Sequence, residues 1–380
     1  MNLDKFCAEH LNLKKSENSL RFLRPISANQ GLHLKIDNTN YINFSSNDYL
    51  GLRNDAAVLA SAKNFLDTYG AGSGASRLVS GNSEAFSLLE NKIARFKKTE
   101  SALVFSSGYA TNLGIIQSLT NKNDLIIGDK LNHASIIDGC RLSEAAFRTY
   151  PHLDLDSLEK LLKEKRSKYT NVLIITDSVF SMDGDIADLK SLCEIKEKYD
   201  CWLMVDEAHS TGVFGENGRG LVDSLQLNSR VDIIMGTLSK ALGSQGGFVA
   251  GSKNLIEYLV NNARSFIYST GLTPAACGAA LKSLEMIESD LTRLKKLNDN
   301  RQYFESITGL KSPTPIYPII LGDSEKALSA ATKIREAGFY VLAIRPPTVP
   351  IGTSRLRITI SAGHSKTEIE SFANLIKKYI

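Results

Sequence analysis

The stretch Trp202-Leu-Met-Val-Asp-Glu-Ala-His209 sets the fold class of this chain. An apolar run without alternation leads into an acid, which is typical of a strand buried on both faces of a parallel sheet. A second apolar run leads into Thr237-Leu-Ser-Lys-Ala-Leu-Gly243. In such sheets, ligands collect at the carboxyl ends of the strands. We therefore expect Asp206 and Lys240 to lie close together at one edge of a sheet.

The rest of the chain alternates between short apolar runs and longer stretches of helical period. The runs predict strands and the longer stretches predict helices, a succession typical of an α/β fold with a mostly parallel sheet covered by helices. Strands are expected at 102–105, 124–127, 172–176, 202–205, 232–235 and 247–250, and helices at 83–97, 155–165 and 189–199.

The pattern of the sequence changes after about Ser283. A charged helical segment is expected from there to about Glu305, followed by a proline-punctuated extended stretch, a strand at 355–360 and an amphipathic helix at 367–379. We predict a large α/β domain and a smaller C-terminal α+β domain. The boundaries are 1–45 for an N-terminal segment, 46–283 for the large domain and 284–380 for the small one.

Composition excludes several classes of protein. A length of 380 residues predicts two or three packed units, and 43% hydrophobic with 23% charged residues is ordinary for a globular chain. A net charge of +4 is too small to indicate nucleic-acid binding. The five scattered cysteines and six histidines show no disulfide or metal spacing, so we expect reduced thiols, a cytoplasmic location and no metal site. Neither a signal peptide nor a membrane span is expected.

Asp206 and Lys240 together can hold both ends of one pyridine ring. The ring would be pyridoxal 5′-phosphate (PLP), whose aldehyde needs a lysine amine and whose ring nitrogen needs a carboxylate to stay protonated. Taken singly, an acid at a strand end is often only a helix cap, and a lysine after a strand is usually solvated. Their succession in this context predicts a PLP site.

Two further strings fit a phosphorylated cofactor. Ser106-Ser-Gly-Tyr-Ala-Thr-Asn112 follows a predicted strand and opens a helix, which offers free N–H groups to a phosphate, although a plain serine cap explains the same pattern. His133 follows another strand and is a candidate to cover the ring face, with a purely structural histidine as the alternative. Gly70-Ala-Gly-Ser-Gly-Ala75 follows a helix instead of a strand, so we expect no dinucleotide site there.

Motifs along nearly the whole chain resemble the α-oxoamine synthases. These PLP-dependent enzymes of fold type I join an amino acid to an acyl thioester with loss of carbon dioxide. Glu207 and Ser210 depart from the Asp and Gly of many members, at positions without an expected contact. The matching strings are Ser45–Leu52, Phe180–Asp185, Val205–Gly212, Thr237–Lys240, Ile267–Thr270 and Ile344–Arg357.

The resemblance implies a role for each matching residue. Lys240 would hold the cofactor and remove the substrate Cα proton, Asp206 would pair with the ring nitrogen, and His133 would cover the ring. A homodimer with shared active sites is also implied. The remaining cofactor contacts implied are Gly108, Tyr109 and Thr237 to the phosphate, His209 and Ser181 to the ring 3′-oxygen, and Ser269 and Thr270 to the phosphate of a neighbouring subunit.

Substrate contacts follow from the same resemblance. Arg355 would bind the amino-acid carboxylate with Asn47 and His133, unless it forms only a surface ion pair. Arg21 matches a residue that meets the distal carboxylate of the acyl chain, and solvation on a helix surface is the alternative.

The Ile344–Pro350 string is most similar to members that make 8-amino-7-oxononanoate for biotin biosynthesis. They condense L-alanine with a pimeloyl thioester of coenzyme A or acyl carrier protein, and release carbon dioxide and the free carrier. The alternatives are another member of the family, such as one that acetylates glycine, and a non-catalytic PLP-fold regulatory subunit. Retention of Lys240, Asp206 and His209 argues against the latter.

Overall fold

The computed structural model describes residues 2–380, without the side chains of residues 28–30. The chain divides into two compact units. The larger unit comprises Asp48–Ser181 and Asp185–Lys295, and the smaller unit comprises the residues up to Asn47, Met182–Gly184 and Lys296–Ile380.

A seven-stranded sheet forms the centre of the larger unit, in the order β4-β10-β9-β8-β7-β5-β6. The neighbours from β9 to β6 are parallel, and only β10 runs antiparallel to its neighbours β4 and β9. The predicted mostly parallel sheet is therefore confirmed. The strands are β4 (Ser101–Phe105), β5 (Leu125–Asp129), β6 (Ala146–Tyr150), β7 (Val172–Asp177), β8 (Trp202–Asp206), β9 (Ile233–Thr237) and β10 (Gly247–Gly251).

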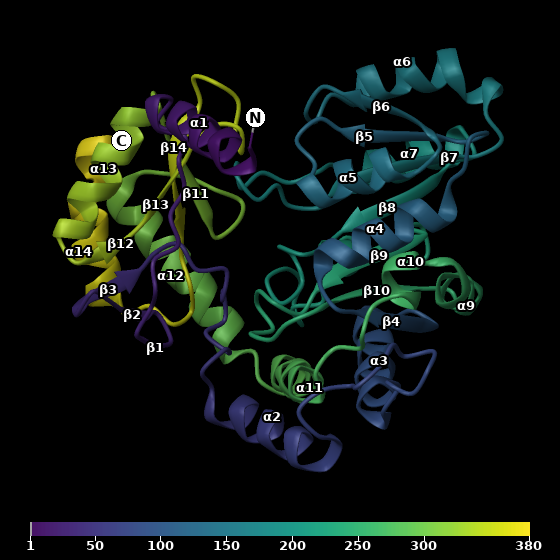
Figure 1. Ribbon diagram of the computed structural model, residues 1–380, viewed down its shortest axis with the longest axis horizontal. Coiled ribbons are helices and arrows are strands. Elements are labelled where there is room, and N and C mark those ends of the chain that lie inside the picture. Colours follow the sequence, from purple (N-terminus) through teal and green to yellow (C-terminus); the bar gives the residue numbers. More distant parts are fainter. Residues whose placement is uncertain (1) are drawn as a thin grey trace. The chain divides into compact units, whose positions relative to one another are not determined.

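Helices pack around this sheet (Figure 1). Strands β5, β7, β9 and β10 are buried at every residue, as expected for strands covered on both faces. The core includes Ile115, Ile126, Leu173 and Met204. The helices are α2 (Ala56–Tyr69), α3 (Glu84–Lys97), α4 (Gly108–Leu119), α5 (Ala134–Leu142), α6 (Leu155–Lys165), η1 (Arg166–Lys168), α7 (Leu189–Lys198), α8 (Leu221–Ser224), α9 (Lys253–Asn262), α10 (Arg264–Ile267) and α11 (Pro274–Ser289).

All six predicted strands and all three predicted helices of this unit are present, within one or two residues of the expected bounds. Strand β6 was not predicted. It lies at the sheet edge, and its exposed Arg148 and Thr149 interrupt the apolar run that marks a central strand.

The smaller unit contains an antiparallel sheet, β11-β14-β13, and a second sheet, β1-β2-β3-β12. Its core joins Phe44 to Phe304 and Phe372, and Phe44 stacks on Phe372 with ring centroids 3.8 Å apart. Helix α14 begins with a capping box between Ser365 and Glu368. The elements are α1 (Leu3–Ser16), β1 (Ala28–Gln30), β2 (His33–Ile36), β3 (Thr39–Asn43), α12 (Thr292–Thr308), β11 (Ile316–Gly322), α13 (Ser324–Glu336), β12 (Phe339–Tyr340), β13 (Leu342–Ile344), β14 (Ser354–Thr359), α14 (Lys366–Ile376) and η2 (Lys377–Tyr379).

Two predicted features of the domain organisation need correction. The single helix expected from Ser283 to Glu305 is interrupted, because α11 ends at Ser289 and the Asp290 carboxylate accepts the Thr292 N–H that starts α12. The boundary expected at 283/284 falls inside α11, and all of α11 belongs to the larger unit, where it packs against α2 and α3. The N-terminal segment 1–45 is not separate, because β3 pairs with β12 in the smaller unit.

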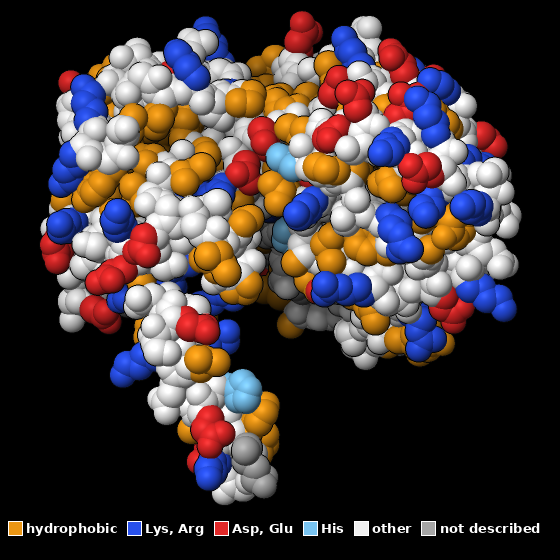
Figure 2. All heavy atoms as spheres, turned by 90° about the horizontal axis from the view of Figure 1, so that it is seen from above, with side chains coloured by type: hydrophobic (Ala, Val, Ile, Leu, Met, Phe, Trp, Pro, Cys, Tyr) orange, Lys and Arg blue, Asp and Glu red, His pale blue; other side chains and the backbone are white. Residues whose placement is uncertain are grey.

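The surface carries charges of both signs. Figure 2 shows basic and acidic side chains intermingled on the visible face, consistent with a net charge of +4. Across residues 2–380, the helices are too short or too polar to cross a membrane.

Candidate functional site

A pocket of about 230 Å³ opens in the larger unit at the carboxyl ends of β8 and β9. It contains both Asp206 and Lys240, as the sequence predicts. Five more predicted residues line it, namely Gly108, Tyr109, His133, His209 and Thr237. The predicted residues Ser181, Ser269 and Thr270 belong to the same unit but do not line this pocket.

Asp206 ends strand β8 and is only 3% exposed. Its Oδ2 accepts a hydrogen bond from Asn112 Nδ2 at 2.9 Å, and its Oδ1 accepts one from the Ala208 N–H at 2.8 Å. These two bonds fix the plane of the carboxylate. Asn112, on α4, was not predicted as a site residue, although it lies in the string that opens this helix. Its position as an amide on a buried helix face is the signal that marks it.

A second buried carboxylate, Asp177, lies at the end of β7 beside β8. It accepts a hydrogen bond from the His133 N–H at 2.7 Å. Burial, together with the negative charge of Asp206, raises the pKa of Asp177 well above its usual range.

His133 caps the start of α5, and its Nδ1 lies 2.7 Å from Ser135 Oγ. Desolvation lowers the pKa of His133; the charge of Asp206 opposes this shift and that of Lys240 adds to it. The imidazole is therefore neutral near pH 7, which suits packing against an aromatic ring. Lys240 lies in the turn after β9, and its charge also acts on Asp177, so its amine shares the pocket with both acids.

His209 follows Asp206 in the loop after β8 and is buried. Its Nδ1 lies 2.6 Å from the hydroxyl of Tyr49, which is also fully buried. This contact fixes the orientation of the imidazole. Tyr49 belongs to one of the strings that carry the family resemblance, but sequence reasoning gave it no role.

The first turn of α4 forms a recess suited to an anion. Ser107 caps the helix by accepting the Ala110 N–H at 3.0 Å, and the helix dipole adds a positive potential. A Cβ on Gly108 would lie 3.2 Å from Met235 Cε and 3.5 Å from Thr237, so glycine keeps the recess open. The Tyr109 hydroxyl donates a hydrogen bond to Asp138, and its side chain is 44% exposed.

The predicted substrate residues Arg21, Asn47 and Arg355 all belong to the smaller unit. Arg355 Nη1 contacts the Asp183 carboxylate and donates to the Met182 carbonyl at 3.2 Å.

Asn47 Oδ1 accepts a hydrogen bond from Arg357 Nη2 at 3.1 Å. Arg357 was not predicted. The two-residue period of β14, which turns both arginines to one face, is the signal that marks it. Arg21 donates to Thr348 Oγ1 at 2.8 Å.

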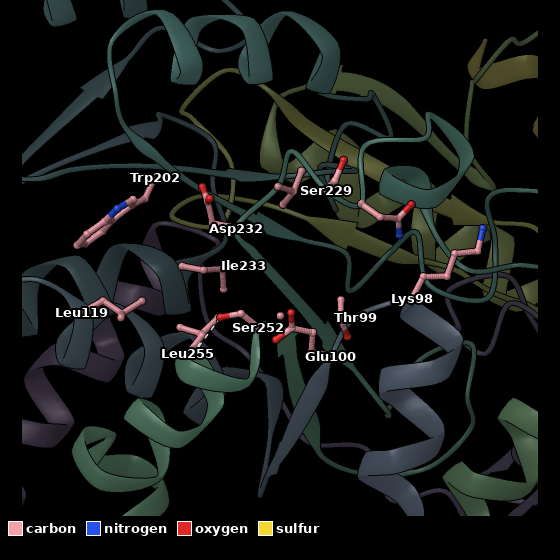
Figure 3. Close-up of a pocket in the computed structure, with 13 residues that line it drawn as sticks. Lys98, Thr99, Glu100, Leu119, Trp202, Ser229, Asp232, Ile233, Ser252 and Leu255 are labelled. Carbon is pink, nitrogen blue, oxygen red and sulfur yellow. Dashed lines mark hydrogen bonds between the residues drawn. The ribbon is translucent and has the colours of Figure 1, made fainter.

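A larger pocket of about 500 Å³ lies at the opposite ends of β8 and β9, around Trp202 and Ile233 (Figure 3). Its charged groups are paired. Asp232 pairs with Lys196 at 2.8 Å, and Lys98 pairs with Asp223 at 2.7 Å. This pocket therefore lacks the converging titratable groups of the smaller one.

The site can hold a flat, phosphorylated ring. It combines a buried carboxylate of fixed orientation, an amine, a neutral imidazole and a helix N-terminus within one pocket. A carboxylate that holds a proton on a ring nitrogen and an amine that reacts with an aldehyde are the two groups that PLP requires. The residues present therefore fit this cofactor.

Comparison with known proteins gives concordant matches. The model of the family Aminotransferase class I and II matches residues 39–376. The 8-amino-7-oxononanoate synthase of Treponema denticola is 48% identical over 349 residues, covering 90% of this chain and 88% of that protein. That of Geobacter sulfurreducens is 44% identical over 371 residues, covering 96% and 95%. A solved structure of serine palmitoyltransferase with PLP superimposes with a TM-score of 0.93 at 30% identity, covering 100% of this chain and 98% of that one.

Proposed function

The chain belongs to the aminotransferase class I and II family, and we propose that it is a PLP-dependent acyltransferase that makes 8-amino-7-oxononanoate for biotin biosynthesis. The observation that carries the proposal is the pocket in which Asp206 and Lys240 meet. The names of relatives 44–48% identical over nearly all of the chain support the choice of product.

The structure of the product indicates the substrates. Its nine-carbon chain carries an oxo group at carbon 7 and an amino group at carbon 8. Carbons 1 to 7 correspond to a pimeloyl group, and carbons 8 and 9 to alanine after its carboxylate has left as carbon dioxide. L-Alanine and a pimeloyl thioester, of coenzyme A or of acyl carrier protein, therefore give the product, carbon dioxide and the free thiol.

PLP, when bound, withdraws electrons from the Cα of the amino acid, so that a bond at this carbon is broken more easily. Asp206 keeps a proton on the ring nitrogen, and Asn112 holds the carboxylate in the required plane. His133 packs against the ring face. The first turn of α4, with Gly108, Tyr109 and Thr237, binds the phosphate. His209, oriented by Tyr49, and Ser181 bind the ring 3′-oxygen.

Lys240 has two tasks in this proposal. Its amine would hold the cofactor through the cofactor's aldehyde, and the free amine would serve as the general base for the Cα proton of alanine. The carboxyl groups of Asp206 and Asp177 set the electrostatic surroundings of this amine. The same amine returns a proton to this carbon once carbon dioxide has left.

The smaller unit supplies the contacts with the substrate carboxylates. Asn47, with the arginines of β14, binds the carboxylate of alanine. We assign the direct contact to Arg355, whose guanidinium also contacts the Asp183 carboxylate, and Arg357 supports it through its hydrogen bond to Asn47. Arg21 binds the distal carboxylate of the pimeloyl chain.

A homodimer is part of the proposal. Ser269 is half-buried and Thr270 is exposed, and both lie outside the cofactor pocket. This exposure supports a role toward the phosphate of a second subunit. The five cysteines are free thiols, which supports a cytoplasmic location.

Product identification tests the proposal directly. The purified protein, loaded with PLP, is incubated with L-alanine and pimeloyl-CoA, and in parallel with glycine and acetyl-CoA. Mass spectrometry should detect 8-amino-7-oxononanoate in the first mixture and release of carbon dioxide from the alanine carboxylate. Preferential turnover of the glycine and acetyl-CoA pair would assign a different acyltransferase activity, and turnover of neither would contradict the proposal.

A further inference from the structure

A buried ion pair in the larger unit joins Lys97, at the end of α3, to Glu207, in the loop after β8. The Lys97 ammonium donates to Glu207 Oε2 at 2.7 Å, and the two side chains are 1% and 0% exposed. Both residues lie outside the lining of the cofactor pocket, yet Glu207 directly follows Asp206. Burial of two charges is costly and often adds no net stability. Stability alone is therefore a poor explanation for this pair.

Lys97 also holds two other points of the chain. All three protons of its ammonium have an acceptor, because it donates to Thr211 Oγ1 at 2.8 Å and to the Arg219 carbonyl at 2.6 Å. Thr211 ends the segment 207–211, which Glu207 begins. One cation therefore contacts both ends of this segment and connects it to the stretch before α8.

The surroundings of the Glu207 side chain are shaped for a carboxylate. Its Oε1 accepts the Val222 N–H at 2.8 Å and the Ser210 hydroxyl at 3.1 Å. Gly220 passes so close that a Cβ there would lie 2.6 Å from Glu207 Oε1, and its φ of +116° is one that residues with side chains rarely adopt. Glycine at this position therefore makes room for the carboxylate.

The same network reaches the backbone of Asp206. Ser178 Oγ donates to the Asp206 carbonyl at 2.8 Å and lies 3.1 Å from Ser210 Oγ. Glu207 and Ser210 are the two positions at which this chain departs from many α-oxoamine synthases, and their side chains contact each other. Both departures therefore belong to one network, which ends on the carbonyl of the residue that faces the ring nitrogen.

We propose that Lys97 and Glu207 are positioning residues for the cofactor site, which hold the segment 207–211 so that Asp206 and His209 face the ring. The inference rests on the proposed function, which gives Asp206 its contact with the ring nitrogen and His209 its contact with the 3′-oxygen. Groups of this kind must be held within about 0.5 Å of their productive position. Loss of the pair therefore weakens cofactor binding even where the protein stays folded.

Titration of the apoprotein with PLP tests this role without turnover. The variants are Glu207→Gln and the double variant Lys97→Met/Glu207→Gln. The dissociation constant is obtained from the absorption of the bound cofactor, and the melting temperature of each apoprotein is measured alongside. Asp232→Asn is the matched control, because Asp232 also pairs with a lysine, Lys196, and accepts a backbone N–H, that of Leu203 at 2.7 Å, but lines the other pocket (Figure 3).

Glu207→Gln should bind PLP roughly tenfold more weakly than the parent, the lower end of the effect known for groups that orient metal ligands. The pH at which the absorption of the bound cofactor changes should also shift, because Asp206 is less firmly placed to hold the proton of the ring. Asp232→Asn should keep the parental affinity and the parental pH profile. An equal loss of affinity in Asp232→Asn, or parental affinity in Glu207→Gln, would overturn the proposal.

The double variant separates positioning from stability. It lacks the unpaired buried ammonium that Glu207→Gln leaves behind, so it should melt at a higher temperature than the single variant. It also lacks all three hydrogen bonds of Lys97, so its affinity for PLP should stay roughly tenfold below that of the parent. Parental affinity in the double variant would contradict a positioning role. If Glu207→Gln does not fold, the double variant alone decides.

The failure of this inference is distinct from that of the proposed function. A parent that forms 8-amino-7-oxononanoate while both variants bind PLP as tightly as the parent would remove only the role of the pair. A loss of PLP affinity in both variants of a protein that does not form this product would remove only the assigned reaction.

Discussion

The two ends of strands β8 and β9 differ in how their charges are balanced. The pocket at the amino ends, around Trp202, is about twice as large as that at the carboxyl ends, about 500 against 230 Å³. Yet both acids that line it have a partner. Asp232 forms an ion pair with Lys196, and Glu100 accepts a hydrogen bond from the Lys253 N–H at 2.8 Å. Such pairs have little effect beyond local stability.

The smaller pocket brings several titratable groups together. Burial raises the pKa of Asp177 and lowers that of His133, and the charges of Asp206 and Lys240 act on both groups. A cluster of titratable groups with shifted pKa values in one pocket is typical of a functional site. The volume of a pocket is therefore a poorer guide to chemistry in this protein than the balance of its charges.

Removal of Lys240 should give the largest effect. Lys240→Ala removes both the covalent link to the cofactor and the general base, so product formation should fall by at least about 10²–10⁴-fold. Borohydride reduction followed by peptide mass spectrometry should find the cofactor on Lys240 in the parent and on no residue of the variant. Lys98→Ala, at the opposite ends of the strands, is the control and should retain activity. Full turnover in Lys240→Ala would invalidate the comparison between the two pockets.

Asp206→Asn should have the second largest effect. The amide keeps the shape of the side chain but cannot hold a proton on a ring nitrogen, so exchange of the alanine Cα proton for deuterium should slow by about 10²–10³-fold. Proton NMR in D₂O measures this exchange without the acyl substrate. Asp232→Asn provides the matched control at the other pocket. Equal exchange rates in parent and Asp206→Asn would mean that the carboxylate has no electronic role.

The sequence predicted the site residues that directly follow a predicted strand. Asp206 and Lys240 each follow an apolar run, so the sheet rule alone brings them to one edge. Asn112 and Asp177 reach Asp206 from α4 and β7. Their convergence depends on the order of strands and the packing of a helix, which apolar periodicity does not specify. The pairing of Arg355 with Asp183 depends in the same way on the short segment Met182–Gly184, which belongs to the smaller unit.

The secondary structure could be predicted for strands that are buried at nearly every residue. It was harder to predict for elements that mix buried and exposed residues. Central strands have continuous apolar runs, whereas β6 at the sheet edge has two consecutive exposed residues, Arg148 and Thr149. The break between α11 and α12 was missed because the sequence around it is charged and has a helical composition throughout. The break depends on one contact, in which the Asp290 side chain accepts the Thr292 N–H at the start of α12.

A smaller effect is expected from Tyr49→Phe, which tests how strictly the pocket positions its imidazoles. The change removes the hydrogen bond to His209 Nδ1 and leaves the ring in place. Because a single neutral hydrogen bond contributes about 0.5–1.5 kcal/mol, kcat/KM for alanine should fall about two- to tenfold. Tyr258→Phe, whose hydroxyl donates to the Ser118 carbonyl at the surface, is the control. A Tyr49 variant as active as Tyr258→Phe would show that His209 is oriented by other contacts.

His152 offers the mildest test, because it lies at the carboxyl edge of the sheet but outside the cofactor pocket, and it is paired with two acids. Burial lowers its pKa, but hydrogen bonds to Asp129 at 2.9 Å and Asp185 at 2.8 Å outweigh this and raise the pKa of His152 to about 10. Because the pKa of His152 is higher in the folded than in the unfolded protein, protonation of His152 stabilises the fold. This contribution is fully present below pH 6.5 and is lost as the pH rises toward 10. The free energy of unfolding of the parent should therefore fall between pH 7 and 10 more than that of His152→Gln, by an amount on the order of 1 kcal/mol after solvent screening, and its melting temperature should fall more as well. Turnover at pH 7 should change little, since a neutralised cluster affects stability and not chemistry. Parallel melting curves for the two proteins across this range would contradict the charged state of His152, and a large loss of turnover would show that a balanced cluster can also belong to the site.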